Sequence, residues 1–207
     1  RHLCQDIVAA GGTQPSVVLM DMATLADVRR AAQEVLAQNR PIDVLLNNAG
    51  IVNLKREETV DGFEETLAVN HYAVFLLTGL LLPALRRASH ARIVNVASHA
   101  HTFVRDMGFD DMQALKKYST FHEYGRSKLA NILFTRELAR RLEPEGITGR
   151  ISGGRLAGNG TRLCMGRSDG RQWQRGCIHR VAGSVTGVFS HGVHTIGCVI
   201  SHISGSI

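Results

Sequence analysis

Short apolar runs alternate with stretches of helical apolar spacing along the first 148 residues of the chain. The apolar runs, which predict strands, cover residues 16–21, 42–50, 91–98 and the start of a fourth at 146–148. The stretches with apolar positions three or four residues apart, which predict helices, cover residues 25–39, 61–87 and 123–142. Thr24 stands before the first of these helices and is available as its N-cap.

The predicted strands are apolar along their whole length, which favours a parallel sheet covered on both faces. Strands separated by helices are typical of βαβ units, so we predict an α/β fold with a doubly wound parallel sheet. Ligands of such sheets bind beyond the carboxyl ends of the strands. Four polar residues stand at predicted strand ends: Asp21, Asn47, Asn48 and Ser98.

The last 59 residues lose this pattern. Residues 149–207 contain 13 of the 21 glycines and show neither the helical nor the strand period. Residues 181–207 lack Asp, Glu, Lys and Arg, but Gly, Ser, Thr and His interrupt them, so the stretch does not favour a membrane span. We interpret 149–207 as an unassigned, irregular Gly/Arg-rich segment, either disordered or translated from a shifted reading frame.

The formal net charge of +6 comes from this segment alone. Residues 1–148 hold 17 basic and 17 acidic residues, whereas 149–207 hold seven Arg and one acid, Asp169. An Arg-rich tail suggests, as an alternative function, a non-enzymatic module that binds an acidic partner or nucleic acid. Only Trp173 and Phe189 could supply aromatic stacking there, so nucleic acid is not the expected partner.

The four cysteines form no CxxC pair and no regular ladder of spacings. This pattern indicates a reducing intracellular compartment, the cytoplasm in the first place, rather than a disulfide framework. The Cys and His residues of the tail match no compact zinc site, and we predict no metal. The chain does not begin with Met, which suggests a fragment or a processed product.

Tyr124 and Lys128 stand four residues apart on one face of the predicted helix 123–142. A phenol is a poor base at neutral pH, but a neighbouring ammonium favours the phenolate and suits Tyr to general acid–base work. Ser98, at the end of the preceding strand, could orient a carbonyl or alcohol oxygen. Taken alone, the pair is more often a partly exposed helix surface.

Four motifs follow one another in fixed order: "NNAG" at 47–50, "VNH" at 69–71, "VNVAS" at 94–98 and "YGRSK" at 124–128. Together they resemble the short-chain dehydrogenase/reductase family over roughly residues 13–148. The segment "SKLANILFTRELARRL" and the 25 residues between Ser98 and Tyr124 are most similar to its retinol dehydrogenase-like branch. The resemblance makes residues 1–148 a partial, Rossmann-like dinucleotide-binding domain.

The resemblance implies catalytic roles for four residues. Tyr124 would give and take the proton at the substrate oxygen, and Lys128 would lower the pKa of that phenol and bind the nicotinamide ribose. Ser98 would hold the reacting oxygen, and Asn70 would support a proton relay through water.

The resemblance also implies a cofactor site for NADP or NAD, with NADP favoured by analogy. Asp21 matches the acid that contacts the adenine amino group, and Met22 follows it. The residues that would line the cofactor after the second predicted strand are Asn48, Ala49 and Gly50. Three of the residues at predicted strand ends also have a purely structural alternative. Asp21 could cap the next helix, Ser98 could be a turn residue, and Asn47 could bond the backbone between strands.

Two departures from the family pattern limit the expected activity. No TGxxxGxG phosphate turn occurs, so the first βαβ unit of the family is missing. After residue 148 no Pro-Gly turn or apolar substrate segment follows. We predict bare sheet edges, marginal stability, aggregation and weak or no cofactor binding.

The sequence therefore predicts an NAD(P)-dependent oxidoreductase that interconverts an alcohol and a carbonyl on a small lipophilic substrate. We expect this chain to be inactive as it stands, and a pseudoenzyme is a further alternative. A homo-oligomer is compatible with the sequence, and no membrane span is expected.

Overall fold

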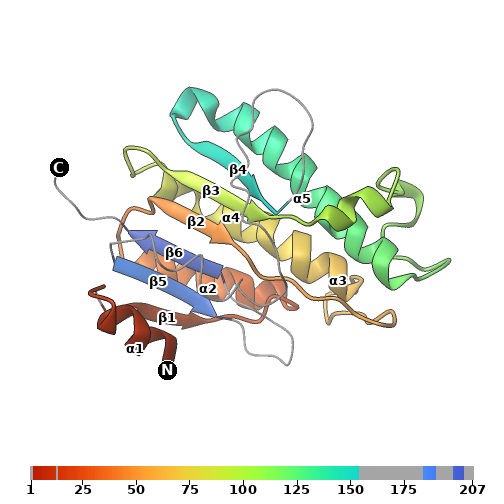
Figure 1. Cartoon of the computed structure of the whole chain (residues 1–207), viewed down its shortest axis with the longest axis horizontal. Coiled ribbons are helices and arrows are strands. Elements are labelled where there is room, and N and C mark those ends of the chain that lie inside the picture. The colour runs from red at the N-terminus through yellow and green to blue at the C-terminus, as the bar shows by residue number, and fades with distance from the viewer. Residues whose placement is uncertain (1, 13, 154–183, 190–197, 203–207) are drawn as a thin grey trace.

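The computed structural model describes residues 2–12, 14–153, 184–189 and 198–202, the last two ranges by their backbone (Figure 1). The strands are β1 (Ser16–Leu19), β2 (Val44–Asn47), β3 (Arg92–Val96), β4 (Thr148–Ser152), β5 (Ser184–Phe189) and β6 (Cys198–His202). The α-helices are α1 (His2–Ala9), α2 (Leu25–Ala37), α3 (Glu65–Leu67), α4 (Ala73–Leu85) and α5 (Thr120–Leu142). A π-helical turn, η1 (Ala68–Tyr72), joins α3 to α4, and the 3₁₀ turns are η2 (His99–Phe103), η3 (Phe109–Asp111) and η4 (Glu143–Glu145).

The described strands form one sheet in the order β1-β5-β6-β2-β3-β4. Strands β2, β3 and β4 are parallel, with Asn47 opposite Asn95 and Asn95 opposite Ile151. These strands and the helices between them agree with the predicted α/β, Rossmann-like class. Strand β4 runs to Ser152, four residues past the boundary expected at residue 148.

The tail supplies two strands that the sequence pattern did not predict. Strand β5 is parallel to β1, and β6 is antiparallel to both β5 and β2, so the sheet is mixed rather than purely parallel. The inner edges of β1 and β2 are therefore paired, contrary to the expectation of bare edges there, whereas β1 and β4 each keep an outer edge that pairs with no described strand. Unpaired backbone N–H and C=O groups at a strand edge can form hydrogen bonds with another segment that lies extended beside them. In the usual doubly wound sheet, with strand order 3-2-1-4, two strands likewise lie between the third and the fourth strand, which correspond to β1 and β2 here.

The long helices lie on one face of the sheet (Figure 1). The neighbouring side chains of Asn47 and Asn95 reach Thr78 of α4 and Thr135 of α5, so both helices cover the same face. On that face α2 and α4 bury one hydrophobic core with the strands, and its fully buried members include Val28, Leu45, Leu77, Leu81 and Ile93. On the other face the side chains of β1 are 44% exposed at Val17 and 55% at Leu19.

Helix ends explain several differences from the predicted boundaries. Helix α2 ends before Asn39, whose φ of 50° is left-handed. Thr24 occupies the N-cap position of α2 but makes no side-chain cap; the Leu25 N–H instead donates to Asp61 Oδ2 at 2.8 Å. Asp61 therefore lies before the helix it was expected to open, and Glu64 is the cap of that helix.

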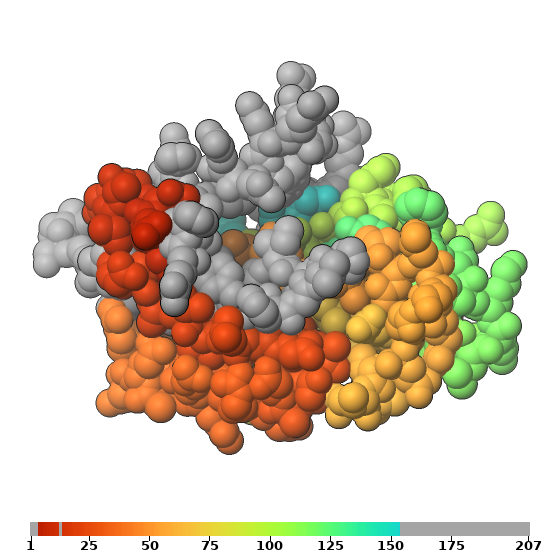
Figure 2. All heavy atoms as spheres, turned by 90° about the horizontal axis from the view of Figure 1, so that it is seen from below, coloured from red at the N-terminus to blue at the C-terminus, as the bar shows by residue number. Residues whose placement is uncertain are grey.

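Helix α1 lies before the first predicted strand, in a part of the chain for which no helix was predicted. It ends at Ala9; Gly11 follows with a φ of 86°, which suits glycine, and the Gly12 N–H donates to Ile7 O at 2.9 Å. Figure 2 shows this N-terminal part, in red, on the opposite side of the molecule from the loop before α5, in green.

The segment Glu65–Leu85, with a mean hydropathy of 1.6, is the described helical segment long and apolar enough to cross a membrane. Leu77, Leu81 and Leu85 of this segment are fully buried against α2 and the sheet. The core therefore accounts for these apolar side chains of the segment.

Candidate functional site

Asn70 lies on the π-helical turn η1 and joins three segments. Its Oδ1 accepts the Ile51 N–H at 2.8 Å, and its Nδ2 donates to Ile51 O at 3.0 Å and to Ser127 Oγ at 2.9 Å. The loop after β2 is thereby attached to helix α5. Because the side chain is fully buried and its donors and acceptor are used, its orientation is fixed.

The π turn also changes the backbone hydrogen bonding around Asn70. The Asn70 carbonyl accepts a hydrogen bond from Asn131 Nδ2 at 2.8 Å. Because Asn131 Nδ2 donates to this carbonyl, the Asn131 atom that faces His71 Nδ1 at 3.0 Å is the amide oxygen Oδ1. This oxygen can only accept, so His71 carries a proton on Nδ1. Burial lowers the pKa of His71, and the neutral imidazole can serve as this donor. Asn131 therefore fixes the turn that presents Asn70.

Lys128 is a buried lysine on α5, with 3% of its surface exposed. Its Nζ donates to Val96 O, at the end of β3, over 3.2 Å. The same Nζ lies 5.5 Å from the centre of the Tyr124 ring. Burial lowers the pKa of Lys128 from 10.5 to about 8. An ammonium in this position favours negative charge that develops nearby.

Gly50 occupies the point where Asn70 and Lys128 approach each other. A Cβ at residue 50 would stand 3.1 Å from Lys128 Nζ and 3.3 Å from Asn70 Oδ1. Both distances are tighter than ordinary contacts, so the absence of a side chain lets the Lys128 ammonium and the Asn70 amide pack against the backbone at residue 50.

Ser98 starts the 3₁₀ turn η2, where its Oγ accepts the Ala100 N–H at 3.2 Å. The turn-residue interpretation therefore describes part of its role, while its hydroxyl hydrogen remains a donor. His101 Nδ1 contacts Ser98 O at 2.7 Å, and His99 is exposed. Gly125, next to Tyr124, packs directly against Ala100, so this turn lies beside the Tyr124 segment.

The predicted cofactor residues fall into two groups. Asn48, Ala49 and Gly50 follow β2, next to Asn70 and Lys128, and Ala49 is buried. Asp21 and Met22 follow β1, three strand spacings away, which is roughly 14 Å at the usual spacing. A dinucleotide could span both groups, but a single small ligand could not.

Asp21 and Met22 have structural roles where they stand. Asp21 Oδ1 accepts the Ala23 N–H at 2.9 Å, and its Oδ2 accepts the Thr24 hydroxyl at 3.3 Å, so its carboxylate organises the start of α2. Met22 is buried in the hydrophobic core, and any contact it makes with a ligand would come from its backbone.

Asn47 is a structural residue with side-chain partners. Its Nδ2 donates to Thr78 Oγ1 at 3.0 Å and to Asn95 Oδ1 at 2.7 Å. Asn95 Nδ2 continues to Thr135 Oγ1 at 2.8 Å, which joins the sheet to α4 and α5. This buried polar network supports the sheet edge that carries the site.

Sequence reasoning missed Ser127, Asn131 and Gly125. Ser127 Oγ donates to Tyr124 O at 2.8 Å and accepts from Asn70, so it connects two candidate catalytic residues. Helical spacing offered a signal, because positions 127 and 131 lie three and seven residues after Tyr124 on the same face. The role of Gly125 depends on a contact with a distant turn, which no spacing reveals.

Among the side chains that the structure describes, no group of three or more His, Cys, Asp or Glu could hold a metal ion. The Cys and His residues considered for zinc belong to the tail and lie outside the described side chains. The site thus consists of polar and cationic groups at the carboxyl ends of β2 and β3.

Comparison with known proteins gives close relatives in sequence. Residues 1–152 match the short chain dehydrogenase family. Retinol dehydrogenase 14 of Mus musculus is 43% identical over 154 residues, which cover 71% of this chain and 46% of the mouse protein. Retinol dehydrogenase 12 of Homo sapiens is 44% identical over 136 residues, which cover 66% of this chain and 43% of the human protein. The chain thus spans a little under half the length of these relatives.

Solved structures agree with the sequence relatives. An uncharacterized protein from Mycobacterium paratuberculosis is 40% identical with a TM-score of 0.58, covering 65% of this chain and 48% of that one. A short chain dehydrogenase from Burkholderia cenocepacia in complex with NADP is 30% identical with a TM-score of 0.56, covering 73% of this chain and 57% of that one. Matched motifs, fold and relatives agree, and the chain belongs to the short-chain dehydrogenase/reductase family, in its retinol dehydrogenase-like branch.

Proposed function

We propose that this site belongs to an NAD(P)-dependent oxidoreductase that interconverts an alcohol and a carbonyl, NADP being the favoured cofactor. The observation that carries the proposal is the convergence of Gly50, Asn70 and Lys128 beside Tyr124. Gly50, Asn70 and Lys128 come from three different segments, and burying an ammonium is unfavourable unless it has partners.

The described residues fit the nicotinamide end of such a cofactor. Lys128 has ammonium hydrogens beyond the one directed at Val96 O, and these suit ribose hydroxyls. Gly50 has no side chain between its backbone and the Lys128 ammonium, and Asn48 and Ala49 precede it in the same loop. The protein from Burkholderia cenocepacia, which was solved with NADP, supports the choice of cofactor. Asp21 would meet the adenine end, with Met22 contributing its backbone.

When bound, the nicotinamide supplies or accepts the hydride. We assign Tyr124 Oη the proton that the substrate oxygen gains during reduction and loses during oxidation. Ser98 Oγ would donate to the same oxygen and hold it toward Tyr124. Lys128 would stabilise charge on the phenol, and Asn70 would keep the loop after β2 and α5 at a fixed separation.

The substrate class is a lipophilic alcohol or carbonyl, as the names of the retinol dehydrogenases among its relatives suggest. The cysteine pattern supports a reducing compartment. The alternative of polyanion binding rests on tail arginines whose side chains lie outside the described part of the chain. No observation favours it over the oxidoreductase.

Calorimetric titration of the chain with NADPH and NADH tests the proposal. We expect saturable binding that is lost in Lys128→Met, which removes the ammonium while keeping most of the side-chain volume. Lys117→Met, a change of the same kind at an exposed lysine, is the matched control and should bind as the unmodified chain does. Equal binding by both variants would refute the role of Lys128. Absence of binding by every protein up to millimolar cofactor would refute cofactor use by this chain.

A further inference from the structure

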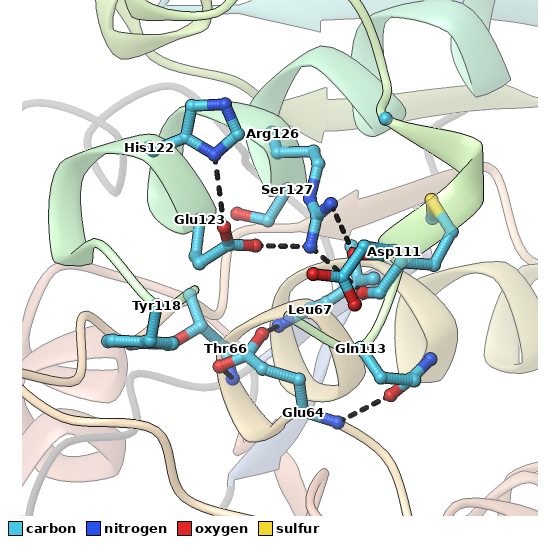
Figure 3. A network of polar contacts seen from close by, with 12 residues as sticks. Glu64, Thr66, Leu67, Asp111, Gln113, Tyr118, His122, Glu123, Arg126 and Ser127 are labelled. Carbon is cyan, nitrogen blue, oxygen red and sulfur yellow. Dashed lines mark hydrogen bonds and ion pairs between the residues drawn. The ribbon is translucent and has the colours of Figure 1, made fainter. Parts of the chain in front are cut away.

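Two buried charged residues flank Tyr124 on helix α5 and do not take part in the site described above. Glu123 is 2% exposed and Arg126 is 3% exposed, and they form an ion pair with each other. In a helix they point away from Tyr124, because successive residues turn by about 100°. His122 Nδ1 lies 3.0 Å from the second carboxylate oxygen, Glu123 Oε1 (Figure 3).

The Arg126 guanidinium also binds the backbone of the loop that precedes α5. Its Nη1 donates to Asp111 O at 2.8 Å, and its Nη2 donates to Met112 O at 2.9 Å (Figure 3). Gly108 folds over the same group, since a Cβ there would stand 3.3 Å from Nη1. A planar fork of donors suits two carbonyls and one carboxylate, which a lysine could not satisfy together.

Other hydrogen bonds hold the two ends of the loop Gly108–Gln113: the Gly108 N–H donates to Asp106 Oδ1 at 2.8 Å, and Arg56 Nε donates to Gln113 O at 2.9 Å. None of its side chains is buried, and Phe109 is 80% exposed. Buried anchors occur on either side, at Met107 and Ala114. Hydrophobic burial and these hydrogen bonds hold the ends of the loop, and Arg126 binds its middle through the Asp111 and Met112 carbonyls.

The same loop reaches the helix that carries Asn70. Gln113 Oε1 accepts the Glu64 N–H at 2.7 Å, and the fully buried Glu64 carboxylate caps α3 by accepting from the Thr66 and Leu67 N–H groups at 2.9 and 2.7 Å (Figure 3). Burial, together with the charge of Glu123, raises the pKa of Glu64. The loop is thus attached to the segments of Tyr124 and of Asn70.

We propose that Arg126, neutralised by Glu123, is a positioning residue that holds the loop Gly108–Gln113 against α5 and so shapes the substrate side of the site. The inference rests on the proposed function for its substrate role. A buried ion pair adds little to stability over an apolar pair of the same size, because removing two charges from water costs as much as their attraction returns. The pair is better explained by the carbonyls that its guanidinium orders.

Hydrogen exchange of the full chain tests the loop contact without any need for activity. Arg126→Gln should speed exchange of the loop amides bonded within the turn, at Asp111, Ala114 and Leu115, by about tenfold or more, since two charged hydrogen bonds are lost. Arg136→Gln, at an exposed arginine on the same helix, is the matched control and should leave these amides unchanged. Helix α2 amides should exchange alike in both variants. Equal loop exchange in the two variants would overturn the proposal.

Arg126→Gln leaves Glu123 without its partner and could unfold the chain. The double variant Glu123→Gln/Arg126→Gln has no unpaired buried charge, so it provides the second measurement. Fast loop exchange with protected α2 amides is expected there, and a protected loop would overturn the proposal. Arg126→Lys should give intermediate protection, because an ammonium cannot reach both carbonyls.

Kinetics separate the substrate role from cofactor binding. If the calorimetry has shown NADPH binding, Arg126→Gln should raise KM for the carbonyl substrate about tenfold while the Kd for NADPH changes less than about twofold. An equal loss of both affinities would contradict the substrate role, even with the loop loosened. Failure of NADPH binding in the unmodified chain would refute the proposed function and leave the exchange result to decide the loop contact.

Discussion

Gly125 packs so closely on Ala100 that a Cβ at residue 125 would stand 2.5 Å from the Ala100 carbonyl oxygen. Ala100 belongs to the turn that Ser98 caps, and Gly125 follows Tyr124 in the chain. The missing side chain therefore sets the separation between the two segments that carry the candidate hydroxyl and phenol. This contact explains why a glycine is needed in the second turn of a long helix.

Gly125→Ala should destabilise the chain by about 1–3 kcal/mol, because the new methyl group meets backbone rather than a movable side chain. Gly79→Ala is the matched control, since it lies in α4 with nothing within 4 Å of its Cβ position. The control should gain up to about 1 kcal/mol from helix propensity. Urea unfolding followed by circular dichroism measures both. A stabilised Gly125→Ala would show that the α5–η2 contact is looser than described.

Lys128 should make stability depend on pH. Its folded pKa of about 8 lies below the unfolded value of 10.5, so the unfolded chain binds more protons between these two values. Stability should therefore rise as the pH increases from 8 to 10.5, and the full cost of the buried charge, about 3 kcal/mol, is present below pH 8.

Lys128→Met removes that cost, so it should be more stable than the unmodified chain at pH 7, and the difference should shrink by pH 10. Urea unfolding at pH 7 and pH 10 measures this for both proteins, with Lys117→Met as the control. A difference between the two proteins that stays constant with pH would mean that Lys128 is solvated in the folded chain.

Asn131→Leu should destabilise the chain by about 1–3 kcal/mol, because the Asn70 carbonyl and His71 Nδ1 each lose a buried partner. Gln33→Leu, which replaces an exposed amide on α2 in the same way, should have little effect. Thermal unfolding compares the two variants. Equal melting temperatures would indicate that the π turn holds without Asn131.

Removal of the tail strands should expose the inner edges of β1 and β2. A chain ending at residue 153 lacks β5 and β6, and its unpaired edges should drive self-association. A chain ending at residue 202 keeps both strands and should behave as the full chain does. Size-exclusion chromatography with light scattering distinguishes these outcomes. A monomeric short chain would mean that the tail strands contribute nothing to edge protection.

Local sequence determined the elements that carry the site. The apolar runs at β2 and β3, the helical spacing of α5 and the four ordered motifs were sufficient, because these signals depend on neighbours within one turn or one strand. The positions of Asn70, Ser98, Tyr124 and Lys128 followed from the same motifs, and the structure brings together the segments that carry them.

Tertiary structure decided what local patterns could not express. The close approach of Gly125 to Ala100, the Asn131 support of the π turn and the Arg126 contact with loop carbonyls join residues that are distant in sequence or hidden within a helix. The pairing of β5 and β6 between β1 and β2 likewise depends on backbone edges that only the folded sheet presents. Periodicity shows which face a residue occupies, but the partner on that face is fixed by packing in three dimensions.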